Sequence, residues 1–212
     1  MDARKYLIDQ YGLDFNKPNP IEIPNQSRTI LCTMFRDLGY KVGAEIGVET
    51  GKYSEVLLKT NPDLTLHCID SWQSYDDYID GINMKDQDVS FREAQERLKG
   101  CRVNFIKEFS MRALRRFENE SLDFVYIDAN HNLPYVMDDI IQWEKKVKHG
   151  GVVAGHDYIK SSKGRATTLR VVEAVNWYVE LKPIKTWFLI GTKAKLEGEV
   201  RDSSRSWFWI KE

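Results

Sequence analysis

Residues 42–54, VGAEIGVETGKYS, constrain the fold of this chain more than any other stretch. An apolar run ends in a turn with two glycines, Gly47 and Gly51, and a helical pattern begins at Thr50. A strand, a tight glycine turn and a helix let a backbone approach a nucleotide-like ligand closely. The third glycine of G-x-G-x-x-G, which helps to cradle a pyrophosphate, is missing. The turn therefore favours a ligand without phosphates, to which Glu45 would offer an acid; an ordinary strand-to-helix turn is the alternative.

Length and composition predict one globular domain. The chain has 212 residues, of which 42% are hydrophobic and 30% charged, enough for a sizeable core. The formal net charge of -1 gives no electrostatic reason to expect nucleic acid or an anionic membrane as partner. No apolar run reaches membrane-spanning length, and the N-terminus lacks the apolar core of a signal peptide. The three cysteines are far apart and indicate reduced thiols, so we expect a cytoplasmic protein without membrane contact.

The first part of the chain is predicted to form a helical cap segment. The first eleven residues have the pattern of a short amphipathic helix, and the proline-rich stretch 17–25 cannot be helical throughout. A second helix follows, with Ser27 at the position of its N-cap and Gly39 just past its end. We expect this segment, residues 1–39, to cover one edge of the main domain, residues 40–212.

The main domain alternates strand and helix patterns, which predicts an α/β fold. Strand-length apolar runs occur seven times, at residues 42–48, 64–70, 101–110, 122–128, 151–157, 186–191 and 206–212. Helical patterns lie between most of them, at residues 50–58, 90–100, 111–120, 132–149 and 167–182. The last two strands are too close in sequence for a helical crossover. We therefore expect a doubly wound, mostly parallel seven-stranded sheet with one antiparallel strand near an edge and helices on both faces.

Asp70 ends the second strand and is the first candidate binding residue after the glycine turn. In an open parallel sheet, ligands bind beyond the carboxyl ends of the strands, where an acid can accept hydrogen bonds from both ribose hydroxyls. The alternative role for Asp70 is that of a turn or N-cap aspartate. His67 lies inside the same strand and is interpreted as a core residue. Residues 71–89 form a long acidic connection, which is typical either of a lid or of a solvated insertion.

A second candidate group lies on the next two strand ends. YIDANHN contains Asp128 and His131, and GGVVAGHDY contains His156 and Asp157. Because parallel strands share a carboxyl edge, these side chains should converge beside the ligand. Two aspartates suit a divalent cation such as Mg²⁺, with His156 adjacent, while a histidine ligand shifts the preference towards Mn²⁺, Fe²⁺ or Zn²⁺. His131 suits a general base, because its pKa lies near neutral pH. The alternative is that the aspartates cap helices and the histidines line the cleft.

At this point the motifs resemble a known family. AEIGVETGKYS resembles the glycine-rich first motif of class I S-adenosylmethionine-dependent methyltransferases, and the spacing to IDSW, EFS, YIDANH and KHGGVVAGHD is similar to the family pattern. D-x-x-H followed by G-G-x-x-x-x-H-D resembles the metal-dependent small-molecule O-methyltransferase branch that includes macrolide-sugar and cephalosporin-tailoring enzymes. The resemblance covers about residues 40–191 and implies a Rossmann-like domain that binds S-adenosylmethionine.

The resemblance also implies a role for each matching residue. The methionine part of the cofactor would lie against Glu45, Gly47 and Gly51, near Tyr53 and Ser54; the ribose against Asp70, flanked by Ser71 and Trp72; and the adenine against Phe109 and Ser110. Asp128, His156 and Asp157 would form the metal site, Asp128 would also touch the cofactor, and Asp128 and His131 would be the catalytic pair. Relatives often have Gly-Asp-Ser where this chain has Glu108, Phe109 and Ser110, and some have an acid in place of His156.

These assignments lead to one hypothesis about the reaction. The sulfonium of the cofactor already activates the methyl group, so the protein has mainly to align a nucleophile with it. A divalent cation, Mg²⁺ or another, would hold the acceptor oxygen and lower its pKa, and His131 would take its proton. The sequence thus predicts metal-assisted O-methylation of a hydroxylated small molecule of sugar or natural-product type, with S-adenosylhomocysteine as product.

Several alternatives stay open. The protein could methylate an amine or acid without metal, with Asp128 orienting the substrate, or bind S-adenosylmethionine without catalysis, although mere binding does not require the D-x-x-H group. A nicotinamide dehydrogenase is disfavoured by the missing glycine, and nucleic-acid methylation has only the short basic stretch 160–165 in its support. The aromatic C-terminal strand, with Trp207, Phe208 and Trp209, could pack on its own helices or form a homo-oligomer contact.

Overall fold

An eight-stranded sheet forms the centre of the part of the chain that the structure describes. The computed structural model describes residues 2–75, 86–159, 169–194 and 197–212, so the stretch 160–165 and most of the acidic connection 71–89 lie outside the described residues. The strand order is β1-β7-β8-β6-β5-β2-β3-β4. The strands are β1 (Ile21–Ile23), β2 (Val42–Ile46), β3 (Thr65–Asp70), β4 (Val103–Lys107), β5 (Leu122–Ile127), β6 (Val147–Gly155), β7 (Trp187–Ile190) and β8 (Trp207–Ile210). Only β8 runs antiparallel to its described neighbours, which confirms the mostly parallel sheet.

The predicted number of seven strands was wrong, because the proline-rich stretch contains an eighth. β1 pairs in parallel with β7, with Ile21 opposite Phe188 and Ile23 opposite Ile190. Ile21 and Ile23 are buried on either side of the partly exposed Glu22, which is the alternation of a strand. A strand of three residues is too short to be recognised by its pattern alone. Its pairing partner lies far away in the sequence, so tertiary contacts decide its conformation.

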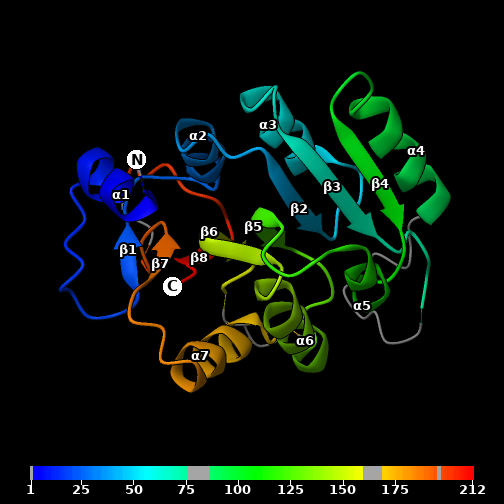
Figure 1. Ribbon diagram of the computed structural model, residues 1–212. Coiled ribbons are helices and arrows are strands. Elements are labelled where there is room, and N and C mark those ends of the chain that lie inside the picture. The colour runs from blue at the N-terminus through cyan, green and yellow to red at the C-terminus, as the bar shows by residue number, and fades with distance from the viewer. Residues whose placement is uncertain (1, 76–85, 160–168, 195–196) are drawn as a thin grey trace.

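Helices cover both faces of the sheet, as predicted (Figure 1). Side chains from α1 to α4 share one buried cluster with Phe124 of β5, and those from α5 to α7 share another with Val125. The helices are α1 (Ala3–Tyr11), α2 (Thr29–Asp37), α3 (Lys52–Thr60), α4 (Gln87–Arg97), α5 (Ser110–Ala113), α6 (Leu133–Glu144) and α7 (Val171–Leu181), with a short 3-10 turn at Leu114–Arg116. None of the helices in the described residues is both long and apolar enough to cross a bilayer.

Several predicted helix boundaries were wrong. The helix expected at 132–149 ends at Glu144, and Val147 instead begins β6 opposite Leu122 of β5. The reason is tertiary: the Leu122 amide donates to the carbonyl of Lys146 at 2.9 Å, which draws the backbone into the sheet. The helix expected at 111–120 reaches only Arg116, in two short turns.

The N-cap prediction for the second helix also failed. The cap position is Arg28 rather than Ser27, and no side chain caps this end of α2. The Ser27 hydroxyl lies 2.8 Å from that of Thr29 instead. At the C-terminal end the prediction was right, because Gly39 follows the helix with a φ of 73°.

The aromatic C-terminal strand packs inside its own chain. Trp207, Phe208 and Trp209 are all buried, and Phe208 stacks on Phe188 of the neighbouring strand with ring centroids 4.7 Å apart. β7 and β8 pair as the antiparallel hairpin that their short separation predicts.

Candidate active site

The glycine turn after β2 brings two strand ends into close contact. Gly47 has a φ of 87°, and a Cβ at this position would lie 2.1 Å from the carbonyl oxygen of Asp128. Its amide donates to the carbonyl of Ile69 at 2.8 Å, so the turn is wedged between the ends of β5 and β3. Only glycine fits here, because any side chain would both clash and strain the backbone. Gly51, with a φ of 73°, begins α3 from a left-handed conformation.

Asp70 at the end of β3 shapes the same turn. One carboxylate oxygen accepts from the amides of Val48 at 3.0 Å and Glu49 at 2.9 Å, and the other accepts from Trp72 at 2.8 Å. Burial raises the pKa of Asp70, and these three amides oppose the shift. The role of a turn aspartate is therefore present. A carboxylate has about four acceptor sites, so the ribose role stays a prediction that this geometry leaves open.

Glu45 is the acid beneath the turn. It is 2% exposed, accepts a short hydrogen bond from the Ser54 hydroxyl, and Ser54 in turn accepts from Cys68 at 3.5 Å. Burial raises the pKa of Glu45 to about 8, with the Ser54 bond acting against it. At neutral pH this carboxyl therefore binds a proton readily, which a typical exposed glutamate does not.

A cavity of about 710 Å³ opens above these strand ends. Most predicted site residues line it, namely Glu45, Gly47, Tyr53, Asp70, Ser71, Phe109, Ser110, Asp128, His131, His156 and Asp157. Three predicted residues do not line it, namely Gly51, Ser54 and Trp72. Ser54 donates a hydrogen bond to Glu45, which does line the cavity. The Trp72 indole is 1% exposed and donates to the carbonyl of Glu49 at 2.8 Å, so it supports the turn from behind.

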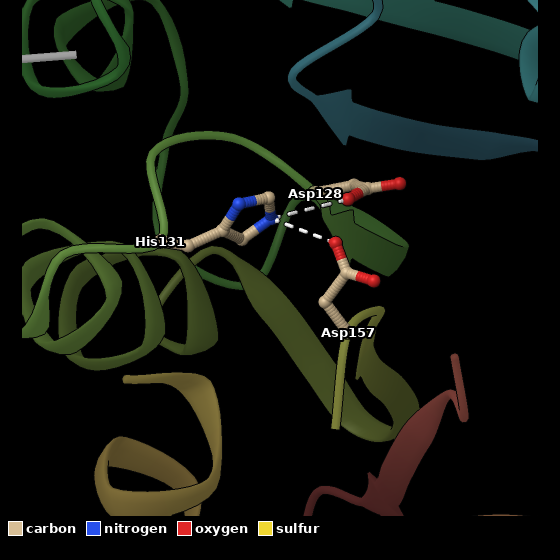
Figure 2. A group of neighbouring side chains, drawn as sticks. All are labelled: Asp128, His131 and Asp157. Atoms are coloured by element: carbon tan, nitrogen blue, oxygen red, sulfur yellow. Dashed lines mark ion pairs between the residues drawn. The ribbon is translucent and has the colours of Figure 1, made fainter. Parts of the chain in front are cut away.

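Two aspartates and two histidines meet at the ends of β5 and β6. His131 Nε2 lies 3.1 Å from Asp157 Oδ2 and 3.5 Å from Asp128 Oδ1, and Figure 2 shows the three side chains pointing toward one another. His156 Nδ1 lies 3.3 Å from Asp157 Oδ1 and 3.7 Å from Asp128 Oδ2. The predicted convergence of the four groups is therefore observed.

One metal-sized arrangement exists within this cluster. Ligand atoms of Asp128, His131 and Asp157 all lie within 4.8 Å of one another. The predicted ligand set contained His156 where this group contains His131. The geometry therefore makes His131 an alternative metal ligand, besides its predicted role as a base. Burial tends to raise the pKa of Asp157. The hydrogen bond from His156 and the charges of His156 and His131 lower it by more than burial raises it, so this carboxylate stays ionised.

Arg28 is a cavity residue that the sequence reasoning missed. Its guanidinium lies 4.7 Å from the centre of the Tyr53 ring, and Nη1 is 3.5 Å from both Asp128 Oδ2 and the Tyr126 hydroxyl. No local pattern marks this residue, because it belongs to the N-terminal segment and meets its partners only in the folded chain.

The sequence reasoning also missed Asp139 of α6, although the spacing of its apolar neighbours in the sequence indicates that it is buried. It is 3% exposed, accepts a short hydrogen bond from Ser110, and Ser110 accepts from the Trp143 indole at 2.7 Å. Burial raises the pKa of Asp139 to about 7, and the Ser110 bond opposes this. Asp139 is three residues after Val136 and four before Trp143, so an acid on an apolar helix stripe was visible.

The family-model match identifies the chain as a methyltransferase. Residues 44–158, more than half of the chain, match the family model described as a methyltransferase domain. The chain therefore belongs to this family. This match confirms the methyltransferase activity that the glycine motif and its spacing indicated.

Solved structures show the same fold at low sequence identity. An O-methyltransferase of tomaymycin synthesis from Streptomyces achromogenes, in complex with S-adenosylmethionine, has a TM-score of 0.59 at 18% identity, over 87% of this chain and 79% of that chain. An O-methyltransferase from Bacillus cereus, in complex with S-adenosylhomocysteine, has a TM-score of 0.59 at 14% identity, over 98% and 96%. A protein from Staphylococcus aureus described as a caffeoyl-CoA O-methyltransferase has a TM-score of 0.62 at 16% identity, over 99% of both chains. No curated protein matches the sequence.

Proposed function

We propose that this protein transfers the methyl group of S-adenosylmethionine to a hydroxyl oxygen of a small molecule of sugar or natural-product type, with His131 as general base. The observation that carries this proposal is the position of His131 Nε2, 3.1 Å from Asp157 and 3.5 Å from Asp128, inside the cavity above the glycine turn. Solved O-methyltransferases with this fold support transfer to oxygen.

The size of the cavity supports a cofactor-binding role. Its volume of about 710 Å³ lies within the usual range of small-molecule sites. Gly47 keeps the turn free of a side chain where β2 and β5 approach each other. In this proposal Glu45, Gly47 and Tyr53 contact the methionine part, Asp70 and Ser71 the ribose, and Phe109 and Ser110 the adenine. Gly51, Ser54 and Trp72 act indirectly, by holding the turn and Glu45.

A divalent cation fits the acid–histidine cluster. Asp128 and Asp157 would hold it, together with the imidazole of His156, while His131 acts as the base. With only two carboxylates and an imidazole, the donor set suits Mn²⁺, Fe²⁺ or Zn²⁺ better than Mg²⁺. A bound cation would hold the acceptor oxygen and lower its pKa.

His131 serves the proton transfer. A hydroxyl is a weak nucleophile while it keeps its proton, and an imidazole near its own pKa accepts that proton efficiently. Asp128 and Asp157 orient the ring and stabilise the imidazolium that forms. The residues around the cavity align the acceptor with the methyl group, which the sulfonium already activates.

Methylation without metal is the second candidate, and one observation favours it. The Arg28 guanidinium lies 3.5 Å from Asp128 Oδ2, where it supplies a positive charge that a cation would otherwise bring. In that case Asp128 orients the acceptor directly. Turnover that survives EDTA would favour this candidate, and turnover restored only by a divalent cation would favour the first.

The first test separates cofactor binding from catalysis. We expect S-adenosylhomocysteine to bind wild type and His131→Ala equally in calorimetry. We expect His131→Ala to lose about 100-fold or more in turnover on a panel of hydroxylated acceptors, because a positioned base contributes roughly 10²–10⁴. His149→Ala is the matched control: His149 pairs with Glu120 at 3.0 Å and does not line the cavity. An active His131→Ala enzyme would remove the base assignment, and a wild type that binds no S-adenosylhomocysteine would contradict the proposed function.

A further inference from the structure

Arg28 is held in the cavity by its own backbone as well as by its side chain. Its amide donates to Asp202 Oδ2 at 2.7 Å, and its carbonyl accepts from the Tyr53 hydroxyl at 3.3 Å. Its guanidinium lies over the ring of the same tyrosine. The anchoring at three points places the positive charge before any ligand enters.

The guanidinium keeps hydrogen-bonding capacity. Its contacts with Asp128 and the Tyr126 hydroxyl both use Nη1, at 3.5 Å, which is long for a charge-assisted bond. Nε and Nη2 make no hydrogen bond to the residues that the structure describes. An arginine with these donors available offers the planar fork that binds a carboxylate through two parallel bonds.

The Arg28 guanidinium is a positive charge in a cavity whose charged groups are mainly acidic. Six carboxyl groups line it, on Glu45, Glu49, Asp70, Asp128, Asp139 and Asp157. Among the lining residues that the structure describes, the lysines and arginines are Lys52, which is exposed, and Arg28, whose side chain is 28% exposed. A ligand carboxylate entering such an acidic cavity needs a cation nearby, because unpaired like charges in a partly buried site repel strongly.

The methionine end of S-adenosylmethionine carries a carboxylate of this kind. Tyr53, in the first turn of α3 beside the glycine turn, lies directly beneath Arg28 and belongs to the residues proposed for that end. We propose that Arg28, contributed by the N-terminal segment, binds the carboxylate of the cofactor's methionine part. This inference rests on the proposed cofactor site and extends it to a residue outside the methyltransferase-domain match at residues 44–158.

The same contact links the two halves of the cavity. Arg28 bridges Tyr53, on the cofactor side, and Asp128, on the acceptor side. When a cofactor carboxylate engages the guanidinium, the 3.5 Å ion pair weakens, and Asp128 becomes available to the acceptor or a cation.

The test is a cycle that changes both partners of the contact. Calorimetry measures the Kd of S-adenosylhomocysteine and of its decarboxylated analogue, each with wild type, Arg28→Gln, Arg28→Lys and Lys52→Gln. We expect Arg28→Gln to weaken S-adenosylhomocysteine roughly 10- to 100-fold, the size of a charge-assisted contact, and the analogue less than about threefold. Arg28→Lys should lie between wild type and Arg28→Gln. Lys52→Gln should change neither Kd by more than about threefold.

Each outcome decides between explanations. An equal loss for both ligands in Arg28→Gln would show that Arg28 only supports the structure, and equal S-adenosylhomocysteine affinity in wild type and variant would show that it binds something else; both overturn the inference. If Arg28→Gln does not fold, Arg28→Lys and the ratio of the two Kd values in wild type, expected to be about 10 or more, still test it. A wild type that binds neither ligand would overturn the proposed function itself, whereas the first two results would leave it standing.

Discussion

Three carboxyl groups in one cavity differ because their surroundings differ. Burial raises the pKa of Glu45 to about 8 and that of Asp139 to about 7, whereas nearby histidines hold the pKa of Asp157 below its usual range. At neutral pH the first two groups are therefore partly protonated and can donate a hydrogen bond. Asp157 only accepts. The sequence alone does not show which of these acids keeps a proton and which stays ionised.

Asp139 makes folding stability depend on pH in a defined direction. Its folded pKa of about 7 lies above the unfolded value of 3.8, so the native state keeps a proton that the unfolded chain releases. The stabilisation is complete below about pH 4 and is lost as pH rises towards 7. Urea unfolding at pH 5 and pH 7.5 should show that Asp139→Asn loses less stability over this interval than wild type, by on the order of 2 kcal/mol.

Asp138→Asn is the control for that measurement, because Asp138 precedes Asp139 in the sequence and its side chain is exposed. It should follow the wild-type pH dependence closely, because burial raises the pKa of Asp139 more than the nearby charge of Asp138 does. If Asp139→Asn and wild type lose the same stability, Asp139 is ionised in the folded protein and the cause assigned to its pKa is wrong.

The elements on one face of the sheet are joined by a buried acid. Glu144, at the end of α6, is 4% exposed and accepts a short hydrogen bond from the Tyr178 hydroxyl of α7. It also accepts from the Trp209 indole of β8 at 3.1 Å and from Lys182 at 2.7 Å. One side chain thus connects two helices and the antiparallel strand. These contacts hold the last turn of α6 in place at the point where the chain leaves the helix and enters β6.

Glu144→Ala should destabilise the protein by about 2–4 kcal/mol, because it leaves buried donors of Tyr178 and Trp209 without their acceptor. The free energy of unfolding in urea measures this. Glu144→Gln keeps an acceptor and should recover part of the loss. S-adenosylhomocysteine affinity should not change, since Glu144 does not line the cavity. Equal stability of Glu144→Ala and wild type would mean that water replaces the lost acceptor.

At the scale of the whole molecule, segments from the two ends of the chain meet. Figure 1 shows β1 beside β7, and the loop before β8 binds the N-terminal segment through several described residues. Arg205 pairs with Glu22 at 2.7 Å, Asn25 Oδ1 accepts from the Val200 amide at 2.9 Å, and Asp202 accepts from the Arg28 amide. This junction positions Arg28, so the edge of the sheet and the cavity are mechanically connected.

Asn25 is the residue in this junction that substitution tests best. It has a φ of 57°, which asparagine tolerates better than alanine, and its side chain holds Val200. Asn25→Ala should lower the free energy of unfolding by about 1–2 kcal/mol, and Asn25→Gly by less, because glycine removes the backbone strain while both lose the hydrogen bond. Urea unfolding distinguishes the two. Alanine and glycine variants of equal stability would show that the left-handed backbone contributes nothing.

The sequence by itself determined the features that depend on local physics. Glycine spacing marked the turn after β2, continuous apolar residues marked buried strands such as β5, and the short separation of β7 and β8 required an antiparallel pair. Parallel strands present their carboxyl ends at one edge of a sheet. This rule was enough to predict that Asp128, His131, His156 and Asp157 lie close together.

Only the tertiary structure decided the features that depend on distant partners. β1 exists because β7 offers it an edge, and α6 ends at Glu144 because β5 takes up the backbone that follows. Arg28 reaches the cavity because the end of the chain holds its amide, and Asp139 carries a shifted pKa because the fold buries it beside Ser110. Pairing and burial are properties of the assembled chain. A pattern in neighbouring residues contains neither.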